Sequence, residues 1–279
     1  MPIPPPWEAR YRVMTSTTSA ERPVVRGGRP GRRALRTVGV LAFWLTLWQV
    51  VAMAVGQQIV LASPVEVVGR LAALVQTAGF WTTVAHSLVR IGTGFAVGAL
   101  VAVVLAALAA AVPLVAALLA PLISTVRATP VVSFIILVIL VTGTGRLALV
   151  ISALMVVPVV YTNTLEGIAH RDVALLEMAA VYRVPRLRRV RAIDVPAVLP
   201  FVVAGCETGV GLAWKSGIAA EVIGLPTGSI GERMYQAKIF LSTPDLFAWT
   251  LVVVALSVAF ERLVRRGLTA AQRRWGGAA

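Results

Sequence analysis

The sequence predicts an all-α polytopic membrane protein with about six transmembrane helices. Hydrophobic residues make up 58% of the 279-residue chain, and its mean hydropathy is +0.85. Apolar runs of about eighteen residues or more recur along the chain, and each is long enough to cross a bilayer. Cys206 is the single cysteine, which excludes an internal disulfide framework and any multi-cysteine metal site.

Three segments follow from the distribution of these runs. Residues 1–34 are rich in Pro, Ser, Thr, Gly and Arg, so we expect a disordered basic cytoplasmic arm. Residues 35–266 hold the hydrophobic runs and form the expected transmembrane domain, and residues 267–279 form an expected cytoplasmic tail. The expected spans are residues 35–55, 91–111, 119–141, 146–165, 198–222 and 246–264.

The basic residues are distributed unevenly around these spans, within a net charge of +14. Eight arginines lie in the arm counted through Arg36, six in the 167–197 loop and five from Arg262 to the C-terminus, against four arginines and Lys238 on the other side. Positive charge gathers in cytoplasmic segments, so both termini and the 167–197 loop are expected in the cytoplasm. A nucleic-acid-binding protein would instead spread its basic residues along a soluble face, so no nucleic acid partner is expected.

A cleaved twin-arginine signal peptide is an alternative interpretation of the N-terminus. Arg32 and Arg33 precede the first apolar run, and Ala52-Met53-Ala54 follows it. That run is long enough to span the membrane and further spans follow, which favours a retained first helix.

The segment between the first two spans begins with a strong helix-start signal. Ser63 can cap the helix, Pro64 suits its first position, and Glu66 stands where a capping box requires it. We expect this helix to lie along the outer membrane surface. Its predicted apolar face has i, i+3, i+4, i+7 spacing and consists of Val68, Leu71, Ala72 and Val75.

The 167–197 loop predicts two short helices with a turn between them. Asp172 is a suitable N-cap for a first helix from Val173 to Tyr182, with Glu177 beside its apolar face. That predicted face consists of Leu175, Leu176, Ala179 and Tyr182.

Prolines delimit the second helix of this loop. Proline lacks an amide donor and disfavours helical geometry at the preceding residue, so Val184-Pro185 ends the first helix. A second, largely basic helix is expected from Arg186 to Ile193, ended by Pro196 and Pro200, which lead into the fifth span. Two helices at an angle form a protrusion suited to a groove on a partner protein.

This loop resembles the EAA motif of bacterial ABC importer permeases: Glu-Ala-Ala, three residues, Gly, nine residues and Ile-x-Leu-Pro. The spacing is kept, but Arg183 stands at the glycine position. A positive φ there would cost an arginine about 1 kcal/mol or more, so we expect a turn rebuilt around Val184-Pro185. By this resemblance the ATPase-docking residues are Glu177, Met178, Ala179, Arg183, Val184, Pro185, Ile193 and Pro196.

Further matches extend the resemblance over residues 35–265, to the nitrate/sulfonate/taurine branch of these permeases. Each match keeps the residue types and spacing of that branch. The matching motifs are Ser63-Pro64-x-Glu66-Val67, His86-Ser87-Leu88-x-Arg90 with Gly94-Phe95, Arg127-Ala128-Thr129-Pro130, Gly143-x-Gly145, Asn163-Thr164 and Ala220-Glu221.

The resemblance implies a MetI-like bundle that works as a homodimer in the bacterial inner membrane. It also implies two copies of a separate ABC ATPase on the cytoplasmic side and a solute-binding protein on the other side. The sequence contains no Walker motif, so we expect ATP hydrolysis on the partner and neither enzymatic activity, cofactor nor metal in this chain. A basic loop that only fixes the topology is the simpler alternative.

Three charged residues fall within the expected fifth span. Glu207 and Lys215 share one face with Gly211, whereas Glu221 is displaced toward the outer end, where we expect a solvated mouth. Each charge would cost about 2.5–3.5 kcal/mol if it faced lipid near the bilayer centre, so all three are expected to face protein or water. They either line the translocation path or form a structural network. Lys215 suits an anionic solute, but the nearby Glu207 leaves the sign of the solute undetermined.

Two other functional classes are open at this point. An ion-gradient-driven secondary carrier would use Glu207 and Lys215 as its ion site and would carry inverted repeats, of which the sequence gives no convincing sign. An intramembrane enzyme would need a nucleophile–base pair. Cys206 beside Glu207 is the one candidate for such a pair, and adjacent helix positions point about 100° apart.

Overall fold

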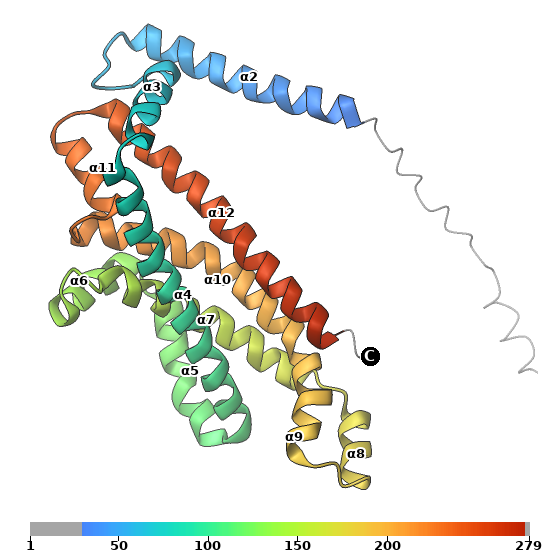
Figure 1. Cartoon of the computed structure of the whole chain (residues 1–279). Coiled ribbons are helices and arrows are strands. Elements are labelled where there is room, and N and C mark those ends of the chain that lie inside the picture. The colour runs from blue at the N-terminus through green and yellow to red at the C-terminus, as the bar shows by residue number, and fades with distance from the viewer. Residues whose placement is uncertain (1–29, 277–279) are drawn as a thin grey trace, which may run out of the picture. The chain divides into compact units, whose positions relative to one another are not determined.

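The computed structural model describes residues 30–276, and this part of the chain is helical, with no strands (Figure 1). The chain divides into two units, Met1–Leu47 and Trp48–Ala279. The expected arm lies mostly outside the described residues. The elements are α2 (Pro30–Val55), α3 (Pro64–Val75), α4 (Ala78–Ala111), α5 (Pro113–Ala128), α6 (Val131–Thr142), α7 (Leu147–Ala169), α8 (Val173–Val181), α9 (Arg186–Arg189), the π turn η1 (Val190–Asp194), α10 (Val195–Gly224), α11 (Ile230–Ile239) and α12 (Thr243–Gly276).

The first unit contributes the part of α2 up to Leu47. This helix already begins at Pro30, inside the range predicted as the arm. From Val38 on, its side chains are mostly apolar and exposed, and Phe43 packs edge-on against Trp44 with ring centroids 5.6 Å apart. An exposed apolar helix of this kind is suited to the hydrocarbon of a bilayer.

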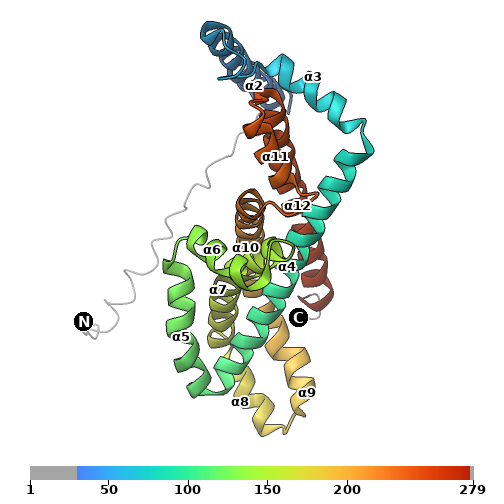
Figure 2. The same cartoon turned by 90° about the vertical axis from the view of Figure 1, so that its left-hand side faces the viewer.

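Three long helices, α4, α7 and α10, form the centre of the second unit and lie side by side in Figures 1 and 2. Glycines let their backbones approach closely. A Cβ added at Gly98 of α4 would lie 2.7 Å from the Ala153 carbonyl oxygen of α7. One added at Gly217 of α10 would lie 2.6 Å from Ile91 Cγ1 of α4. These helices therefore cannot slide past one another without repacking.

The core of this unit is filled by large side chains from the same three helices. Burying them stabilises the packing by roughly 1.5–3 kcal/mol for each side chain removed from water, although in lipid the tight contact itself carries more of the energy. Cys206 is buried among them in α10. The fully buried members include Ile91, Ile151, Val156, Val160, Val210 and Trp214.

The third expected span, residues 119–141, is not one continuous helix. α5 ends at Ala128, α6 begins at Val131, and the two are bent by 110°. Pro130 cannot donate a backbone hydrogen bond, and it biases Thr129 toward the extended geometry that it adopts here. The described residues therefore contain five helices long and apolar enough to cross a bilayer, or six if α5 and α6 make one broken crossing.

The other five expected spans are confirmed as helices, but several ends differ from those predicted. α4 begins at Ala78, well before residue 91, because the Thr77 side chain caps it by accepting from the Phe80 amide. α12 continues to Gly276, so most of the expected cytoplasmic tail is helical. Hydropathy marks only the apolar part of such helices, whereas their polar ends are set by caps and local propensity.

The capping box predicted at the start of α3 is confirmed. The Glu66 amide donates to Ser63 Oγ at 3.4 Å, and the Ser63 amide donates to Glu66 Oε2 at 2.8 Å. This reciprocal pair satisfies two amides that have no partner within the helix.

The apolar face predicted for α3 was wrong in register. Leu71 belongs to the buried face as expected, but its neighbours there are Val67 and Leu74, whereas Val68, Ala72 and Val75 are exposed. α3 is apolar on more than one side, so spacing alone does not choose the buried stripe. Contacts with Trp48 of α2 and Phe247 of α12 determine which face of α3 is buried.

An ion pair holds α3 to the start of α12. Arg70 donates two hydrogen bonds to Asp245, one of them from Nη2 to Oδ2 at 3.2 Å. This hydrogen bonding raises the pKa of the Arg70 guanidinium above its ordinary value. The pair stabilises the end of the bundle where α3 and α11 lie.

Candidate functional site

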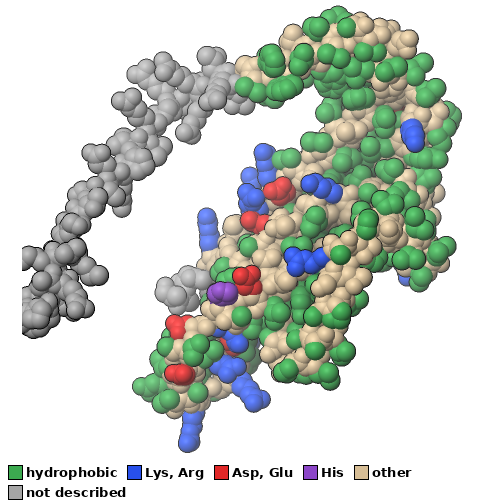
Figure 3. Space-filling model, turned by 180° about the vertical axis from the view of Figure 1, so that it is seen from behind, with side chains coloured by type: hydrophobic (Ala, Val, Ile, Leu, Met, Phe, Trp, Pro, Cys, Tyr) green, Lys and Arg blue, Asp and Glu red, His purple; other side chains and the backbone are tan. Residues whose placement is uncertain are grey.

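The docking loop, residues 167–197, begins with a capped helix. Asp172 Oδ1 accepts from the backbone amides of Ala174 at 2.8 Å and Leu175 at 3.3 Å, which confirms it as the N-cap of α8. The loop projects beyond the ends of α7 and α10 in Figures 1 and 2. Figure 3 shows basic and acidic side chains gathered over this end of the molecule, at the lower left.

The apolar face predicted for α8 is only partly correct. Ala179 is 2% exposed and Leu176 is half-buried, but Leu175 and Tyr182 are exposed. A protruding helix of nine residues meets the rest of the fold along one narrow line, so its other apolar side chains face outward. An apolar patch outside the membrane indicates a protein partner. The outward apolar residues near the exposed Glu177 are Leu175, Met178, Val181, Tyr182 and, on α9, Leu187.

The turn after α8 keeps the geometry that the family glycine would supply. Arg183 has a φ of +50°, so the expected rebuilding around Val184-Pro185 is wrong. The Val184 amide donates to the Ala179 carbonyl at 2.9 Å and the Arg183 amide to the Ala180 carbonyl at 3.0 Å. This is a Schellman arrangement, which satisfies the last carbonyls of the helix and offsets the strain of a left-handed arginine. Pro185 then precedes α9 as its N-cap.

We expect Arg183→Gly to stabilise the docking loop by about 0.5–1 kcal/mol, because glycine adopts a positive φ without a Cβ clash. Hydrogen exchange of the Arg183 and Val184 amides should slow relative to the wild type. Arg183→Ala is the matched control, since it removes the charge but keeps the strain. Equal protection in Arg183→Gly and Arg183→Ala would show that the left-handed backbone carries no strain.

The second helix of the docking loop does not end at Pro196 and Pro200 as predicted. α9 passes through the π turn η1 directly into α10, so the helix is continuous from Arg186 to Gly224. Ile193 and Pro196 are half-buried inside this continuous segment. Each proline removes one donor, and the wide turn before them takes up the local distortion, so the helix continues.

Asp194 lies in the π turn and was not singled out by the sequence reasoning. Its Oδ1 lies 2.7 Å from Arg171 Nη1, at the start of the docking loop, and its Oδ2 lies 3.4 Å from Arg189 Nε. The two ends of the loop are thus joined at one carboxylate. The available signal was a lone acid three residues after Arg191, the last arginine of a basic run, and spacing alone does not assign such an acid to a particular partner.

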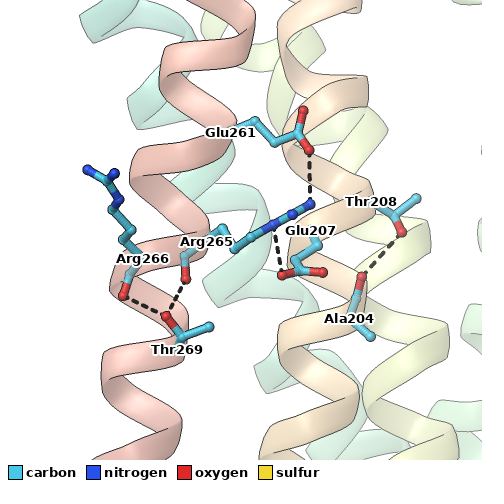
Figure 4. A network of polar contacts seen from close by, with 7 residues as sticks. All are labelled: Ala204, Glu207, Thr208, Glu261, Arg265, Arg266 and Thr269. Carbon is cyan, nitrogen blue, oxygen red and sulfur yellow. Dashed lines mark hydrogen bonds and ion pairs between the residues drawn. The ribbon is translucent and has the colours of Figure 1, made fainter. Parts of the chain in front are cut away.

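Glu207 does not pair with Lys215. Its carboxylate lies 3.3 Å from Arg265 Nε on α12, and Arg265 also binds Glu261 at 3.1 Å (Figure 4). The guanidinium therefore bridges α10 and α12 and is shared between the carboxylates of Glu207 and Glu261. This arrangement favours the structural interpretation of Glu207 over a place in the path.

The face of α10 turned away from its own bundle is a stripe of mostly small or polar residues with one leucine. Lys215 on this stripe is exposed and has no acidic side chain at ion-pair distance within residues 30–276. A Cβ added at Gly211 would meet nothing within 4 Å. The α10 stripe consists of Ala204, Thr208, Gly211, Leu212 and Lys215.

Glu221 is buried, so the solvated mouth expected around it is wrong. Its side chain is 0% exposed. Ser87 Oγ of α4 donates to Glu221 Oε2 at 2.7 Å, and the Gly231 amide of α11 donates to the same oxygen at 3.3 Å. Ser87 also accepts from the Ile230 amide at 2.9 Å. The carboxylate holds α4, α10 and the N-terminus of α11 together, which is a structural role.

The same cluster gathers motifs that lie far apart in the sequence. Ser87 and Arg90 belong to one matched motif and Glu221 to another, and the Arg90 guanidinium donates to the Thr227 carbonyl at 3.3 Å. Sequence reasoning identified these residues but could not assign their contacts, because the partners lie far apart in the sequence. Thr227, for example, lies 137 residues after Arg90.

The profile of the family described as binding-protein-dependent transport system inner membrane component matches residues 94–272. This match covers more than half of the chain and includes the docking loop and α10. The chain belongs to this family. The resemblance of the docking loop to the EAA motif is therefore supported by family membership as well as by the spacing of its residues.

Several relatives match the permease over most of its length. The taurine transport system permease protein of Escherichia coli (strain K12) is 27% identical over 88% of this permease and 91% of its own chain. Another Escherichia coli permease protein, named for aliphatic sulfonate transport, is 30% identical over 78% and 82%. The bicarbonate transport system permease protein of Synechococcus elongatus is 24% identical over 66% of each chain.

These matches establish the functional class. The permease is the transmembrane subunit of an ABC importer of the nitrate/sulfonate/taurine type, which confirms the resemblance stated from the sequence. It is a multi-pass membrane protein of a transport family, so the secondary-carrier alternative is set aside. The family implies an ATPase and a solute-binding protein as partners.

Proposed function

We propose that the docking loop binds a separate cytoplasmic ATPase, one for each copy of the permease. Glu177 and the outward apolar side chains of α8 stand on a protrusion beyond the ends of α7 and α10, within reach of a partner. An apolar patch with an acid beside it provides both burial and electrostatic selectivity. The chain has no Walker motif, so the ATPase supplies the energy for transport.

A second copy of the permease completes the translocation path along the α10 stripe. The observation that carries this proposal is Lys215, exposed in the middle of a spanning helix without an acidic partner among the described residues. A lysine facing lipid there would cost about 2.5–3.5 kcal/mol, so protein or water must cover it. Two stripes facing each other across a two-fold axis provide a water-filled path between small side chains.

Both termini and the docking loop face the cytoplasm, and the solute-binding protein docks at the opposite end, where α3 and α11 lie. The arginine distribution supports this orientation, since the docking loop alone carries six arginines. Closure of the ATPases then shifts the dimer between inward-open and outward-open states, because the closed pair fits one state better than the other.

The solute is a small anion. Arg265 of α12 pairs with Glu207, whereas Lys215 carries a positive charge on the α10 stripe without an acidic partner among the described residues, and this supports an anionic solute. Relatives named for aliphatic sulfonate, taurine and bicarbonate transport agree with an anionic group in the solute. A positive charge lining a narrow aqueous path raises the local concentration of anions and repels cations.

We expect Lys215→Met to reduce anion uptake by about tenfold or more, since a hydrogen bond to a charged group contributes about 1.5–3 kcal/mol. Uptake in proteoliposomes with the ATPase and binding protein gives the measurement. Lys215→Arg should retain most of the activity because it keeps the charge. Lys215→Arg is therefore the matched control for Lys215→Met, since the two variants differ in the charge at this position. Full uptake by Lys215→Met at unchanged stability would remove Lys215 from the path.

Purification of the permease from its native membranes tests the proposed assembly. An affinity-tagged chain in mild detergent should retain an ATPase at one copy per permease, detected by mass spectrometry and by ATP hydrolysis. A permease that purifies as a homogeneous chain without any ATPase, under conditions where it stays folded, would contradict the docking proposal. A co-purifying binding protein would lead directly to the solute.

A further inference from the structure

We propose that Asp194 is the joint that transmits movement of the docking loop to α10. The inference rests on the proposed function of that loop. Asp194 is the last residue of the π turn between the loop and α10. It is therefore placed at the one point where the docking loop becomes the helix that carries the α10 stripe.

One carboxylate holds both ends of the docking loop. Arg171, in the turn between α7 and α8, donates from Nη1 to Asp194 Oδ1 at 2.7 Å. The same guanidinium donates from Nε to the Ile168 carbonyl at 2.8 Å, in the last turn of α7. Arg189 of α9 donates to Asp194 Oδ2 at 3.4 Å. The carboxylate thus connects α7, α9 and α10.

Partial burial makes this contact a fixed one. The side chain of Asp194 is 14% exposed, that of Arg171 27% and that of Arg189 42%. Exposed ion pairs form and break readily, whereas the loss of a half-buried carboxylate leaves its two guanidinium groups uncompensated. Movement of either end of the loop therefore carries the other end with it.

The surroundings of the joint allow it to move. A groove of about 370 Å³ lies between the ends of α4 and α7 and the start of α10, and Arg171, Arg189 and Asp194 line it. The Thr164 hydroxyl, which also lines this groove, is buried and has no hydrogen-bond partner among the described residues. π turns are local rearrangements of the helical hydrogen bonds, here with the Val195 amide bound five residues back to Val190.

Beyond the joint, the helices are rigidly packed. A Cβ added at Gly167 of α7 would lie 2.7 Å from Phe201 Cβ of α10, and one at Gly205 would lie 3.0 Å from Asn163 Cβ. α7 and α10 are too close to bend separately. A displacement of the docking loop passes through Asp194 and moves α10, with its stripe, as one body.

The test is Asp194→Asn, which keeps the shape of the side chain and one acceptor oxygen but loses the charge that both arginines share. The permease is reconstituted in proteoliposomes with its ATPase and binding protein, and the number of solute molecules imported per ATP hydrolysed is measured. We expect the ATPase to stay bound at the wild-type stoichiometry. The coupling ratio should fall by about tenfold, within the range for residues that couple two sites.

Two further variants distinguish a loss of transmission through Asp194 from a loss of the folded structure. Glu166→Gln removes an exposed acid at the same end of α7 whose carboxylate makes no hydrogen bond or ion pair among the described residues, so it should leave the ratio unchanged. The charge exchange of Asp194→Arg with Arg171→Asp and Arg189→Asp restores both ion pairs in reverse and should recover at least half of the lost coupling. This triple variant also tests the proposal if Asp194→Asn alone fails to fold.

The outcomes are distinct. A normal ratio in Asp194→Asn overturns the proposal. Loss of the ATPase from Asp194→Asn together with transport also overturns it, since Asp194 would then act in docking. Failure of the charge exchange to recover coupling in a folded, ATPase-bound complex shows that the ion pair is not the connection. If the wild-type permease itself binds no ATPase, the proposed function fails instead.

Discussion

Glu177→Lys is expected to abolish solute uptake while the permease still inserts into the membrane. Glu177 is exposed on α8, outside the spans, so its replacement disturbs no packed contact. A reversed charge in a docking surface costs several kcal/mol, and we expect ATPase affinity to fall by about 100-fold or more, which corresponds to about 3 kcal/mol. Pull-down of the ATPase with the tagged permease, together with uptake, measures both effects.

Glu166→Lys is the matched control for this prediction. Glu166 is also an exposed acid at the same end of the molecule, but it lies on α7 and outside the EAA-type motif. We expect this control to bind the ATPase normally. Normal uptake by Glu177→Lys, with the same expression level as the wild type, would falsify the docking role of α8.

The second large effect is expected at Glu221, and it is an effect on stability. Glu221→Ala leaves the buried Ser87 hydroxyl and the Gly231 amide without their acceptor. Each unpaired buried group costs about 1–3 kcal/mol, so we expect a total loss of about 3–5 kcal/mol. The midpoint of thermal unfolding in detergent should fall by roughly 10 °C for a chain of this size.

Glu221→Gln distinguishes this structural role from a role in the path. Both hydrogen bonds end on Oε2, while Oε1 has no partner among the described residues. A glutamine can place its carbonyl oxygen at the Oε2 position, so we expect a change within about 1 kcal/mol and transport near the wild-type level. A stable Glu221→Gln permease that has lost transport would restore Glu221 to the path.

Local sequence signals predicted local structure well. The capping box of Ser63 and Glu66 and the N-cap at Asp172 are confirmed, because both depend on residues within one helical turn. The apolar runs predicted the spanning helices for the same reason, since length and composition decide whether a helix suits a bilayer. Pro130 was a signal for the helix break after Thr129, but the high hydropathy of residues 119–141 led to the prediction of one continuous span.

The wrong or missing predictions concern contacts that sequence spacing does not encode. The Glu207–Arg265 pair joins residues on two helices, and the spacing that placed Glu207 and Lys215 on one face of α10 gives no information about Arg265 of α12. Likewise, Glu221 looked solvated because its position near a helix end says nothing of Ser87, which covers it from another helix. At Arg183, the cost of a positive φ was correctly estimated, but the two backbone hydrogen bonds that offset it follow from the fold.

Beyond the joint at Asp194, α10 also acts as a lever. Its 30 residues, at about 1.5 Å per residue, span roughly 45 Å, so its two ends are separated by more than the thickness of the bilayer core. A tilt of about 10° around the docking end moves the far end by roughly 8 Å, which is close to the diameter of one helix. A rotation too small to disturb the ATPase contact is therefore large enough, at the opposite surface, to admit or exclude a small solute.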